Sequence, residues 1–473
     1  MASERETPGT TLIAVLKKAA LNHGGKNAFM VERPVPAIVD KKVPPALPPE
    51  DWTKWTYQQY HDDVSKAAKG FITLGLRRFQ SVNIWGFNAP EWHISALAAS
   101  FAGAKCAGLY PTDSAEAAAY KVVHSQGAIC VVEDMKKVER LVVALSERHD
   151  CKHLKAFVAY GFLPAEDAAV KITPIGKVPI LSWKAMMAGA DQTSDELLAE
   201  RIAGVKPGHC AGLIYTSGTT GEPKAVMISH DAVTYEAVAI IHILKDAVGF
   251  AAGGEERSLS YLPLSHVAGM MVDMIAPLVA TANHPAYHVC YFARPYDLKE
   301  KAIKDRLNAC KPTMFLGVPL VWEKIADQIR AIGAAGSALQ QTIGGTAKSI
   351  TLEYSRNQQR GGSGYAPWGT CVSMSLLSKV KAGLGLGQCK FGLTGAAPIR
   401  VDTLEYYGSL GLNINEAYGM SECTGACTIS TRSTTSGAPA VRSFRASRWS
   451  PSKLTRKTST RKRSVLGPRA CRT

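Results

Sequence analysis

Residues 213–224 read LIYTSGTTGEPK, an apolar run that passes into hydroxyl-bearing residues and glycines and ends in a proline and a lysine. The β-favouring run Ala211–Tyr215 predicts a strand, and Val226–Ile228 predicts a second strand directly after the loop. We therefore expect a strand–loop–strand unit here, around which the rest of the chain is organised.

The loop between these two strands has the residue types that hold phosphate groups. Gly218 and Gly221 let the backbone come close to a ligand, so that successive N–H groups can point at phosphate oxygens. Lys224 adds a positive charge, and the neighbouring hydroxyl groups supply further donors. The loop is not a Walker A motif, because Pro223 precedes the lysine and a strand follows it. A flexible surface turn is the alternative, and the many specified positions favour the phosphate loop.

Two later segments carry further chemistry. Residues 390–398 read KFGLTGAAP, which predicts a strand that ends in small residues where a flat ligand can lie against the backbone. A tight strand-to-helix turn is the alternative for this segment, and taken alone it is the better one. Residues 415–422 read NEAYGMSE. Tyr418 can stack on a purine, and Glu422 can hold a Mg²⁺ ion that bridges phosphates.

Together, in this order, the three segments resemble the signature motifs of the acyl-adenylate-forming (AMP-binding) superfamily. The resemblance implies that Lys224 and Glu422 act in catalysis and that Glu422 binds the metal. It further implies a nucleotide site built from Thr216, Ser217, Gly218, Thr219, Thr220, Gly221, Glu222, Pro223, Lys224, Gly395, Ala396, Ala397, Pro398, Glu416, Ala417, Tyr418, Gly419, Met420 and Ser421.

Further segments narrow the resemblance to long-chain acyl-CoA synthetases of the bubblegum type. They are GFNAPEW at residues 86–92, YLPLSH at 261–266, FLGVP at 315–319 with VWEK at 321–324, and LTGAAP at 393–398. The similarity runs from about Lys26 to about Ser430. It implies that His266 and the helix after it flank the acyl pocket. Without the family, a satisfied histidine at a helix start is the preferred interpretation of His266.

The order of predicted elements indicates an α/β fold. Helices and strands alternate before the phosphate loop, which is typical of βαβ units and a largely parallel sheet. After the loop we expect a helix from Asp231 to Leu244, a strand at Ser258–Leu262 and a helix at Val267–Ala280, whereas residues 333–387 allow no clear prediction. The resemblance implies a large N-terminal domain with two mainly parallel sheets flanked by helices and a smaller β subdomain.

Three segments are expected along the chain: an N-terminal extension with a helix at 1–25, the AMP-binding domain at 26–430, and a basic, disordered tail at 431–473. The net charge is +16, and the 12 Lys and Arg after residue 430, where Asp and Glu are missing, leave only +4 on the rest. We expect the family's small C-terminal domain to be absent. The tail is either a native basic arm or a non-native terminus such as a shifted reading frame, and we prefer the second.

The resemblance implies ATP-dependent activation of a long-chain fatty acid. The carboxylate attacks the α-phosphorus of ATP, pyrophosphate leaves, and the acyl-adenylate passes to the thiol of coenzyme A, with Mg²⁺ assisting. We expect this activity to be impaired in the present chain. The alternatives are a non-catalytic remnant that binds ATP or acyl groups, and a ligase for another carboxylic acid.

The composition indicates the class of protein and the environment in which we expect it. With 46% hydrophobic and 20% charged residues, the chain is typical of a globular protein. Apolar runs stay short of the ~18–20 residues of a membrane span, and we identify neither a signal peptide nor a Ser-Lys-Leu ending, so a cytoplasmic protein is expected. Eleven scattered cysteines indicate free thiols. Nucleic acid is not expected as a partner, and peripheral contact with an anionic membrane stays open, as do acyl chain length, oligomeric state and organelle.

Overall fold

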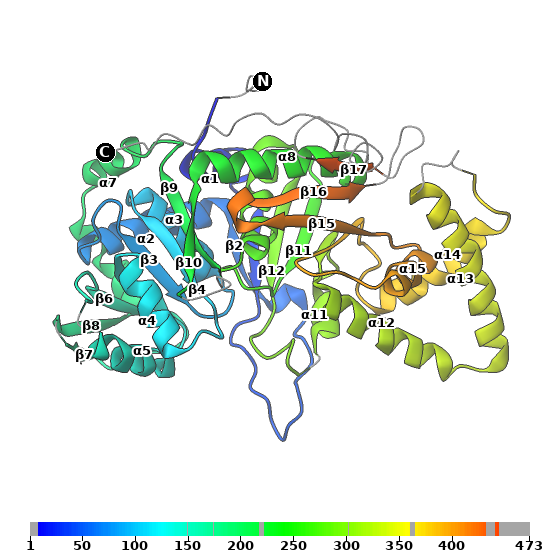
Figure 1. The fold of residues 1–473 in the computed structure, drawn as a ribbon, viewed down its shortest axis with the longest axis horizontal. Coiled ribbons are helices and arrows are strands. Elements are labelled where there is room, and N and C mark those ends of the chain that lie inside the picture. The colour runs from blue at the N-terminus through cyan, green and yellow to red at the C-terminus, as the bar shows by residue number, and fades with distance from the viewer. Residues whose placement is uncertain are drawn as a thin grey trace, which may run out of the picture.

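The computed structural model describes residues 8–148, 150–173, 175–216, 222–300, 302–359, 365–431 and 440–443. Three sheets with helices packed on them make up these ranges (Figure 1). The predicted α/β fold with largely parallel strands is confirmed.

The largest sheet has eight strands in the order β10-β9-β4-β3-β5-β6-β8-β7. Its inner pairs are parallel, and β10 and β7 join as antiparallel edge strands. The strands are β3 (Ser81–Trp85), β4 (Lys105–Leu109), β5 (Gly127–Val132), β6 (Ala156–Ala159), β7 (Ala169–Ile172), β8 (Gly176–Ser182), β9 (Cys210–Thr216) and β10 (Lys224–Ser229). Connecting helices are α2 (Tyr57–Thr73), α3 (Pro90–Phe101), α4 (Ala115–His124), α5 (Met135–Glu147), α6 (Trp183–Ala188) and α7 (Asp195–Ala203).

Two smaller sheets stand beside it. The four-stranded sheet has the order β11-β12-β1-β2, and the five-stranded sheet runs β13-β14-β15-β16-β17. Their strands are β1 (Asn27–Val31), β2 (Thr53–Thr56), β11 (Glu255–Ser260), β12 (Tyr287–Phe292), β13 (Met314–Leu316), β14 (Phe391–Gly395), β15 (Ile414–Met420), β16 (Gly425–Thr431) and β17 (Ala440–Ser443). Because β1 pairs with β12, residues 27–31 lie inside the four-stranded sheet, next to a strand from the second half of the chain.

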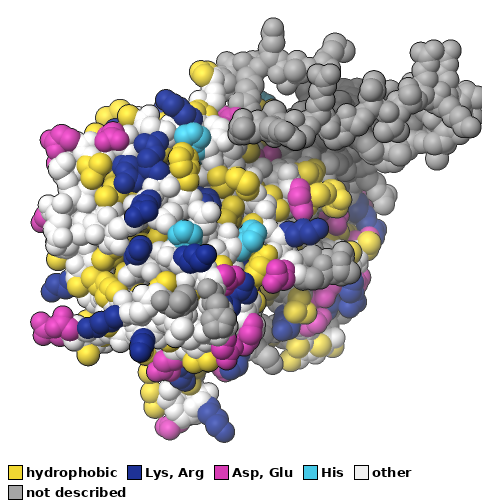
Figure 2. All heavy atoms as spheres, turned by 60° about the vertical axis from the view of Figure 1, so that its left-hand side comes forward, with side chains coloured by type: hydrophobic (Ala, Val, Ile, Leu, Met, Phe, Trp, Pro, Cys, Tyr) yellow, Lys and Arg dark blue, Asp and Glu magenta, His cyan; other side chains and the backbone are white. Residues whose placement is uncertain are grey.

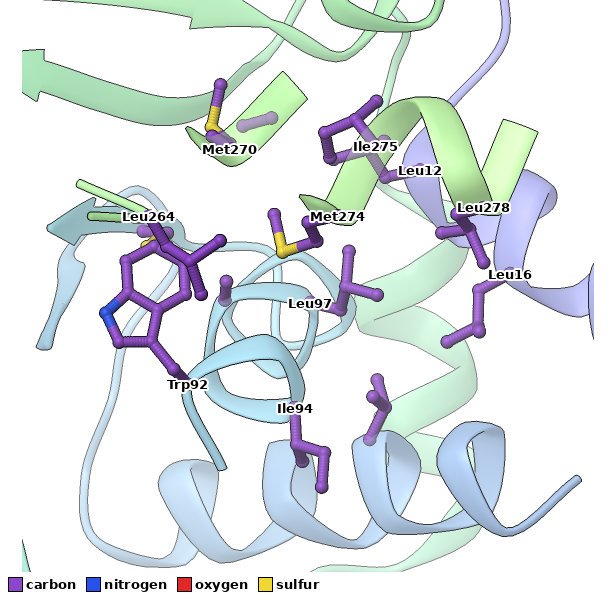
Figure 3. Close-up of a cluster of buried hydrophobic side chains, with 14 of the residues drawn as sticks. Leu12, Leu16, Trp92, Ile94, Leu97, Leu264, Met270, Met274, Ile275 and Leu278 are labelled. Carbon is purple, nitrogen blue, oxygen red and sulfur yellow. The ribbon is translucent and has the colours of Figure 1, made fainter. Parts of the chain in front are cut away.

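The main hydrophobic core lies between the sheets, where other elements pack around the helices. Every residue of α3 is buried, and α3 packs against α2. The helix α1 (Leu12–His23) lies on α10 (Ala276–Asn283) and buries Leu12 and Leu16 there. Figure 3 shows Leu12 beside Ile275 and Leu16 beside Leu278. The predicted N-terminal helix is therefore part of the core.

Several predicted elements differ from the observed ones. The expected helix Val267–Ala280 is divided into α9 (Val267–Gly269), a π-helical turn (Met270–Ile275) and α10. The helix α8 (His230–Val248) has Ser229 rather than Asp231 as its N-cap, because the Ser229 hydroxyl accepts the N–H of Ala232. Residues 333–387, for which the sequence allows no clear prediction, contain α13 (Ala338–Gln359) and α14 (Thr370–Gly383).

These last helices form a lobe of their own at one end of the molecule. The helices α12 (Pro319–Ala334), α13, α14 and α15 (Val401–Ser409) lie together on one side of the five-stranded sheet, with α11 (Ile303–Cys310) nearer the centre (Figure 1). A second hydrophobic cluster fills this region around Trp322 and Tyr407.

The predicted tail lies mostly outside the described residues, and within it Ala440–Ser443 forms β17 against β16. On the side of the molecule that lies at the left in Figure 1, basic and acidic side chains are interspersed over the surface (Figure 2). Within the described ranges, none of the helices is both long and apolar enough to cross a membrane.

Candidate functional site

The predicted phosphate loop connects the edge strand β10 to its antiparallel neighbour β9. Thr216 at the end of β9 pairs in register with Lys224 at the start of β10, so these two residues mark the two ends of the loop. Ser217, Gly218, Thr219, Thr220 and Gly221 lie outside the described residues. At the other end of the loop, the side chains of Glu222 and Lys224 are exposed and Pro223 is half-buried. The strand–loop–strand prediction is thus confirmed, and the lysine faces solvent at the loop's exit.

The second and third predicted segments lie on neighbouring strands. β14 and β15 run parallel, with Gly395 opposite Ala417 and Thr394 opposite Glu416. A Cβ atom on Gly395 would lie 2.9 Å from the carbonyl oxygen of Ala417, so only glycine allows this close approach. Ala396 follows with a φ of 68°, which turns the chain out of the sheet. Ala396, Ala397 and Pro398 are consequently exposed beside β15.

A tight hairpin between β15 and β16 presents the third segment. Tyr418 is 65% exposed and Met420 41% exposed, whereas Ser421 is buried. Glu422 lies in the short 3-10 turn Ser421–Cys423, and its side chain is exposed. The Glu416 N–H donates to Ser430 Oγ at 2.7 Å, which ties the two strands together.

The hairpin turn brings the first segment to the third, because β10 lies against the 3-10 turn that contains Glu422. The structure therefore places β10, the strand that follows the phosphate loop, and β14, which leads into the small residues, next to the segment that contains Tyr418 and Glu422. A lone exposed carboxylate such as Glu422 fits a Mg²⁺ ion that arrives with substrate phosphates, since Mg²⁺ is commonly held by one or two carboxylates plus phosphate oxygens. Among the described residues, no group of three or more acidic, His or Cys side chains could form a metal cage.

His266 caps the helix that follows β11. Its Nδ1 accepts the N–H of Ala268 at 3.1 Å, and its ring faces that of Tyr110 at 6.5 Å. Burial lowers the pKa of His266, so the imidazole is neutral at physiological pH. This is the satisfied histidine that the residue alone indicates, and a contact with an acyl group stays a prediction.

A small apolar cavity of about 30 Å³ lies beside β9, the strand that leads into the phosphate loop. Residues 211–214 of β9 form one wall, and Leu264, Met270 and Met274, from the segments on either side of His266, form the other. Trp92 and Leu97 of α3 close it from below (Figure 3). The volume is enough for about two water molecules, so a longer guest requires the lining side chains to move. Methionines suit such movement because they are unbranched and flexible.

Two buried carboxyl groups near these motifs were missed by the sequence analysis. Glu236 on α8 accepts the N–H of Ala426 in the hairpin, and burial raises its pKa to about 7. Asp273 lies in the π-helical turn and hydrogen-bonds with Ser260, and burial raises its pKa to about 8. A single acid within a long apolar stretch is the signal that could have identified Asp273.

A family model described as AMP-binding enzyme matches residues 27–445, which include all three motifs. The chain belongs to the AMP-binding enzyme family. The predicted narrower resemblance, to bubblegum-type long-chain acyl-CoA synthetases, is also confirmed by relatives within this family.

Long-chain-fatty-acid–CoA ligase ACSBG2 of Xenopus laevis is 38% identical over 381 residues, which cover 80% of this chain and 49% of that protein. Human ACSBG2 is 35% identical over 394 residues, which cover 82% of this chain and 55% of the human protein. For ACSBG1 of Bos taurus the identity is 35%, with 79% of this chain and 48% of the relative covered. The chain thus spans about half the length of the curated relatives it matches.

Solved structures of AMP-binding enzymes share the fold. The anthranilate CoA ligase AuaEII in complex with anthranoyl-AMP gives a TM-score of 0.60 at 14% identity and covers 91% of this chain and 63% of its own. Apo MatB from Rhodopseudomonas palustris gives 0.57 at 17% identity, with 92% and 65% covered. The N-terminal domain of FACL13 from Mycobacterium tuberculosis gives 0.56 at 12% identity, with 89% and 79% covered.

Proposed function

We propose that this chain carries the adenylating site of a long-chain fatty acid–CoA ligase of the AMP-forming type. In this reaction a fatty carboxylate displaces pyrophosphate from ATP, and the resulting acyl-adenylate then reacts with coenzyme A. The observation that supports the proposal most is that the second and third motifs lie on the paired strands β14 and β15, while β10, which follows the phosphate loop, lies against the turn that carries Glu422. A site for adenylation needs these motifs to share one ligand.

Each motif has a physical task in this proposal. Negative charge accumulates on the α-phosphate oxygens and on the departing pyrophosphate, and Lys224 at the loop's exit stabilises it. Tyr418 offers an exposed ring face for the adenine, beside Gly395–Pro398, whose small residues leave room for a flat base. Glu422 would hold Mg²⁺, which neutralises phosphate charge when bound. Without a side-chain nucleophile, positioning and electrostatics carry the catalysis.

The acyl group is assigned to the apolar cavity for two reasons. Its wall on β9 runs directly into the phosphate loop through Leu213 and Ile214, so a chain in the cavity has its carboxylate end directed to the loop. Its other wall includes the segment after His266, where the family resemblance implies the acyl pocket. The neutral imidazole of His266 would not attract a carboxylate, which fits a wall of an apolar pocket rather than a carboxylate anchor.

The test is exchange of labelled pyrophosphate into ATP that depends on added fatty acid. We expect the wild-type chain to catalyse the exchange and the Lys224→Ala variant to lose about 100-fold, as is typical when one charge-stabilising donor is removed. Glu422→Gln should lower the rate and raise the Mg²⁺ concentration needed for half-maximal exchange. The matched controls are Lys177→Ala and Glu139→Gln, which change exposed residues far from the motifs in the sequence.

The outcomes separate the alternatives. Exchange that both controls keep and both site variants lose supports adenylation by this chain. ATP binding without exchange would instead indicate a non-catalytic binding remnant. Exchange that depends on an aromatic or amino acid rather than a fatty acid would contradict the assigned substrate class.

A further inference from the structure

A second cavity lies directly beside the apolar one. It measures about 10 Å³, and Tyr57, Tyr60, His93, Asp273 and His288 line it together with apolar residues, so we call it the polar cavity. Met274 lines both cavities and therefore lies between them. The apolar cavity lies along β9, the strand that leads into the phosphate loop.

The wall between the cavities is an unusual piece of backbone. Met270–Ile275 forms a π-helical turn between α9 and α10. Such turns insert an extra residue into a helix and are frequent at functional sites. Here Met270 and Met274 line the apolar cavity, while Asp273 lines the polar one. The turn thus supplies an apolar wall and a polar wall from neighbouring residues.

The polar cavity contains hydrogen-bonding groups that the protein itself leaves unpaired. Within the described part of the chain, Tyr60 Oη, His93 Nε2 and His288 Nδ1 are buried without a hydrogen-bond partner. Tyr60, His93 and His288 are 3%, 1% and 2% exposed, so bulk water does not reach them. Buried polar groups are normally paired, and three unpaired ones around one cavity indicate a small polar guest.

The size and chemistry of the cavity identify that guest. A volume of about 10–15 Å³ holds one water molecule, which needs two to four polar partners. Burial lowers the pKa of both His93 and His288 to about 3, so both rings are neutral and each can donate or accept according to its tautomer. The raised pKa of Asp273 keeps its carboxyl group protonated at pH 7, which adds a donor and an acceptor.

We propose that the polar cavity binds one hydroxyl-sized group at the far end of the acyl site, with Met274 as the movable partition. In the resting protein this group is a water molecule. When a long acyl chain displaces Met274, its end enters the polar cavity. The part of this inference that concerns the acyl chain rests on the proposed function. The water site does not depend on the proposed function.

A selectivity for the chain end follows from the geometry. A terminal methyl group that displaces the water leaves Tyr60, His93 and His288 without partners, which is unfavourable. A terminal hydroxyl group replaces the water's hydrogen bonds. Sites built to hydrogen-bond a hydroxyl group discriminate strongly against the analogue that lacks it. Long acids that reach this cavity should therefore be accepted better when they carry a terminal hydroxyl group, whereas shorter acids should not show this preference.

The water site is tested first, by a crystal structure of the full chain at a resolution that shows ordered water. We expect one water within hydrogen-bond distance of Tyr60 Oη, His93 Nε2 and His288 Nδ1. A dry cavity, or one filled by a rearranged side chain, would overturn the proposal. This result does not depend on any enzymatic activity.

The acyl end is tested with saturated acids from decanoate to tetracosanoate and the matching ω-hydroxy acids. Fatty-acid-dependent exchange and the rise in melting temperature on adding each acid are measured in parallel. For the longest acids we expect the wild-type chain to prefer the ω-hydroxy form about 10-fold in kcat/KM. Tyr60→Phe, which removes one unpaired hydroxyl group, should bring this ratio towards one.

Met274→Ala removes the partition and should shift the preferred length upward for unsubstituted acids. Met227→Ala is the matched control, because Met227 is 71% exposed on β10. If exchange occurs but neither length preference nor the ω-hydroxy ratio changes in Met274→Ala and Tyr60→Phe, the inference is wrong while the proposed function stands. If no acid supports exchange or shifts the melting temperature, the proposed function fails and the acyl part of the inference with it.

Discussion

Asp273 is an acid placed where its charged form is unfavourable. It is 4% exposed in the π-helical turn, and burial raises its pKa from 3.8 to about 8. Between these two values the folded chain holds a proton that the unfolded chain releases. Stability therefore falls as the pH rises through this window, because folding requires the carboxyl group to stay protonated.

We expect Asp273→Asn to flatten this dependence, since an amide is neutral at every pH. The wild-type chain should lose stability on the order of 4 kcal/mol from pH 4 to pH 9 through this one group, by linkage from the pKa shift. Urea unfolding of both proteins at several pH values measures the slope. Asp305→Asn, at an exposed position, is the control. A variant with the wild-type slope would show that Asp273 ionises normally.

Gly419 is fixed by the backbone opposite it. A Cβ atom at this position would lie 1.9 Å from the carbonyl oxygen of Gly425, across the β15–β16 hairpin. Gly419→Ala must displace that backbone, and overpacking of this kind costs about 1–3 kcal/mol. We expect a lower melting temperature and weaker ATP binding, because Tyr418 and Glu422 flank the same turn.

Gly392→Ala on β14 is the matched control. Its added Cβ atom would meet neighbours at 3.6 Å, which is an ordinary contact distance. This variant should stay close to the wild-type melting temperature and ATP affinity. Equal losses in the two variants would contradict the assigned close approach at Gly419.

Among the elements, α1 offers a sharp test of its place in the core. Leu16 is 0% exposed and packs into the main core, whereas Leu21 on the same helix is 85% exposed. We expect Leu16→Ala to cost about 2–5 kcal/mol, as is typical for a buried leucine. Leu21→Ala should change the free energy of unfolding by less than about 0.5 kcal/mol. Chemical denaturation of the two variants measures both, and a mild Leu16→Ala would mean that α1 is loosely attached.

Elements with strong local patterns were predictable from the sequence. The helix α4 belongs to the alternating helices and strands that the sequence predicts before the phosphate loop, and the Ser114 side chain caps it by accepting the N–H of Ala117. The loop strands β9 and β10 were predicted from β-favouring runs beside a turn-forming loop. In both cases local propensity and tertiary structure agree.

Other elements depend on tertiary contacts and could not be predicted. α13 contains Gly344, Gly345 and three Thr residues, which are weak helix formers, and it packs on α14 and α15. The π-helical turn interrupts an apolar stretch whose pattern fits a continuous helix. For the site, the order of the motifs was predictable, whereas the pairing of β14 with β15 and the two cavities required the structure.

At the scale of the whole molecule, a buried ionic cluster joins distant parts of the chain. Glu32, just after β1, contacts Arg306 at 2.5 Å and Arg294 at 3.7 Å, and Asp297 contacts Arg294 at 2.9 Å. All four side chains are at most 1% exposed. Two positive and two negative charges balance one another, so removal of one leaves an uncompensated buried charge.

We expect Glu32→Gln to cost about 3–5 kcal/mol for that reason. The control is Glu405→Gln, which removes an exposed ion pair with Arg356 and should cost less than about 1 kcal/mol. Guanidinium unfolding curves of both variants give the values. If Glu32→Gln were as mild as the control, water or a rearranged neighbour would have to reach the two arginines.

The pairing of β1 with β12 joins two strands that are synthesised at very different times. Phe29 pairs with Cys290, so about 260 residues are synthesised between the two partners, which takes on the order of 10–50 s at about 5–20 residues per second. During that time the apolar face of α1, which α10 later covers, has left the ribosome without its partner. The segment that carries α1 and β1 is therefore synthesised long before α10 and β12, and its apolar side chains stay without their native partners until those elements emerge.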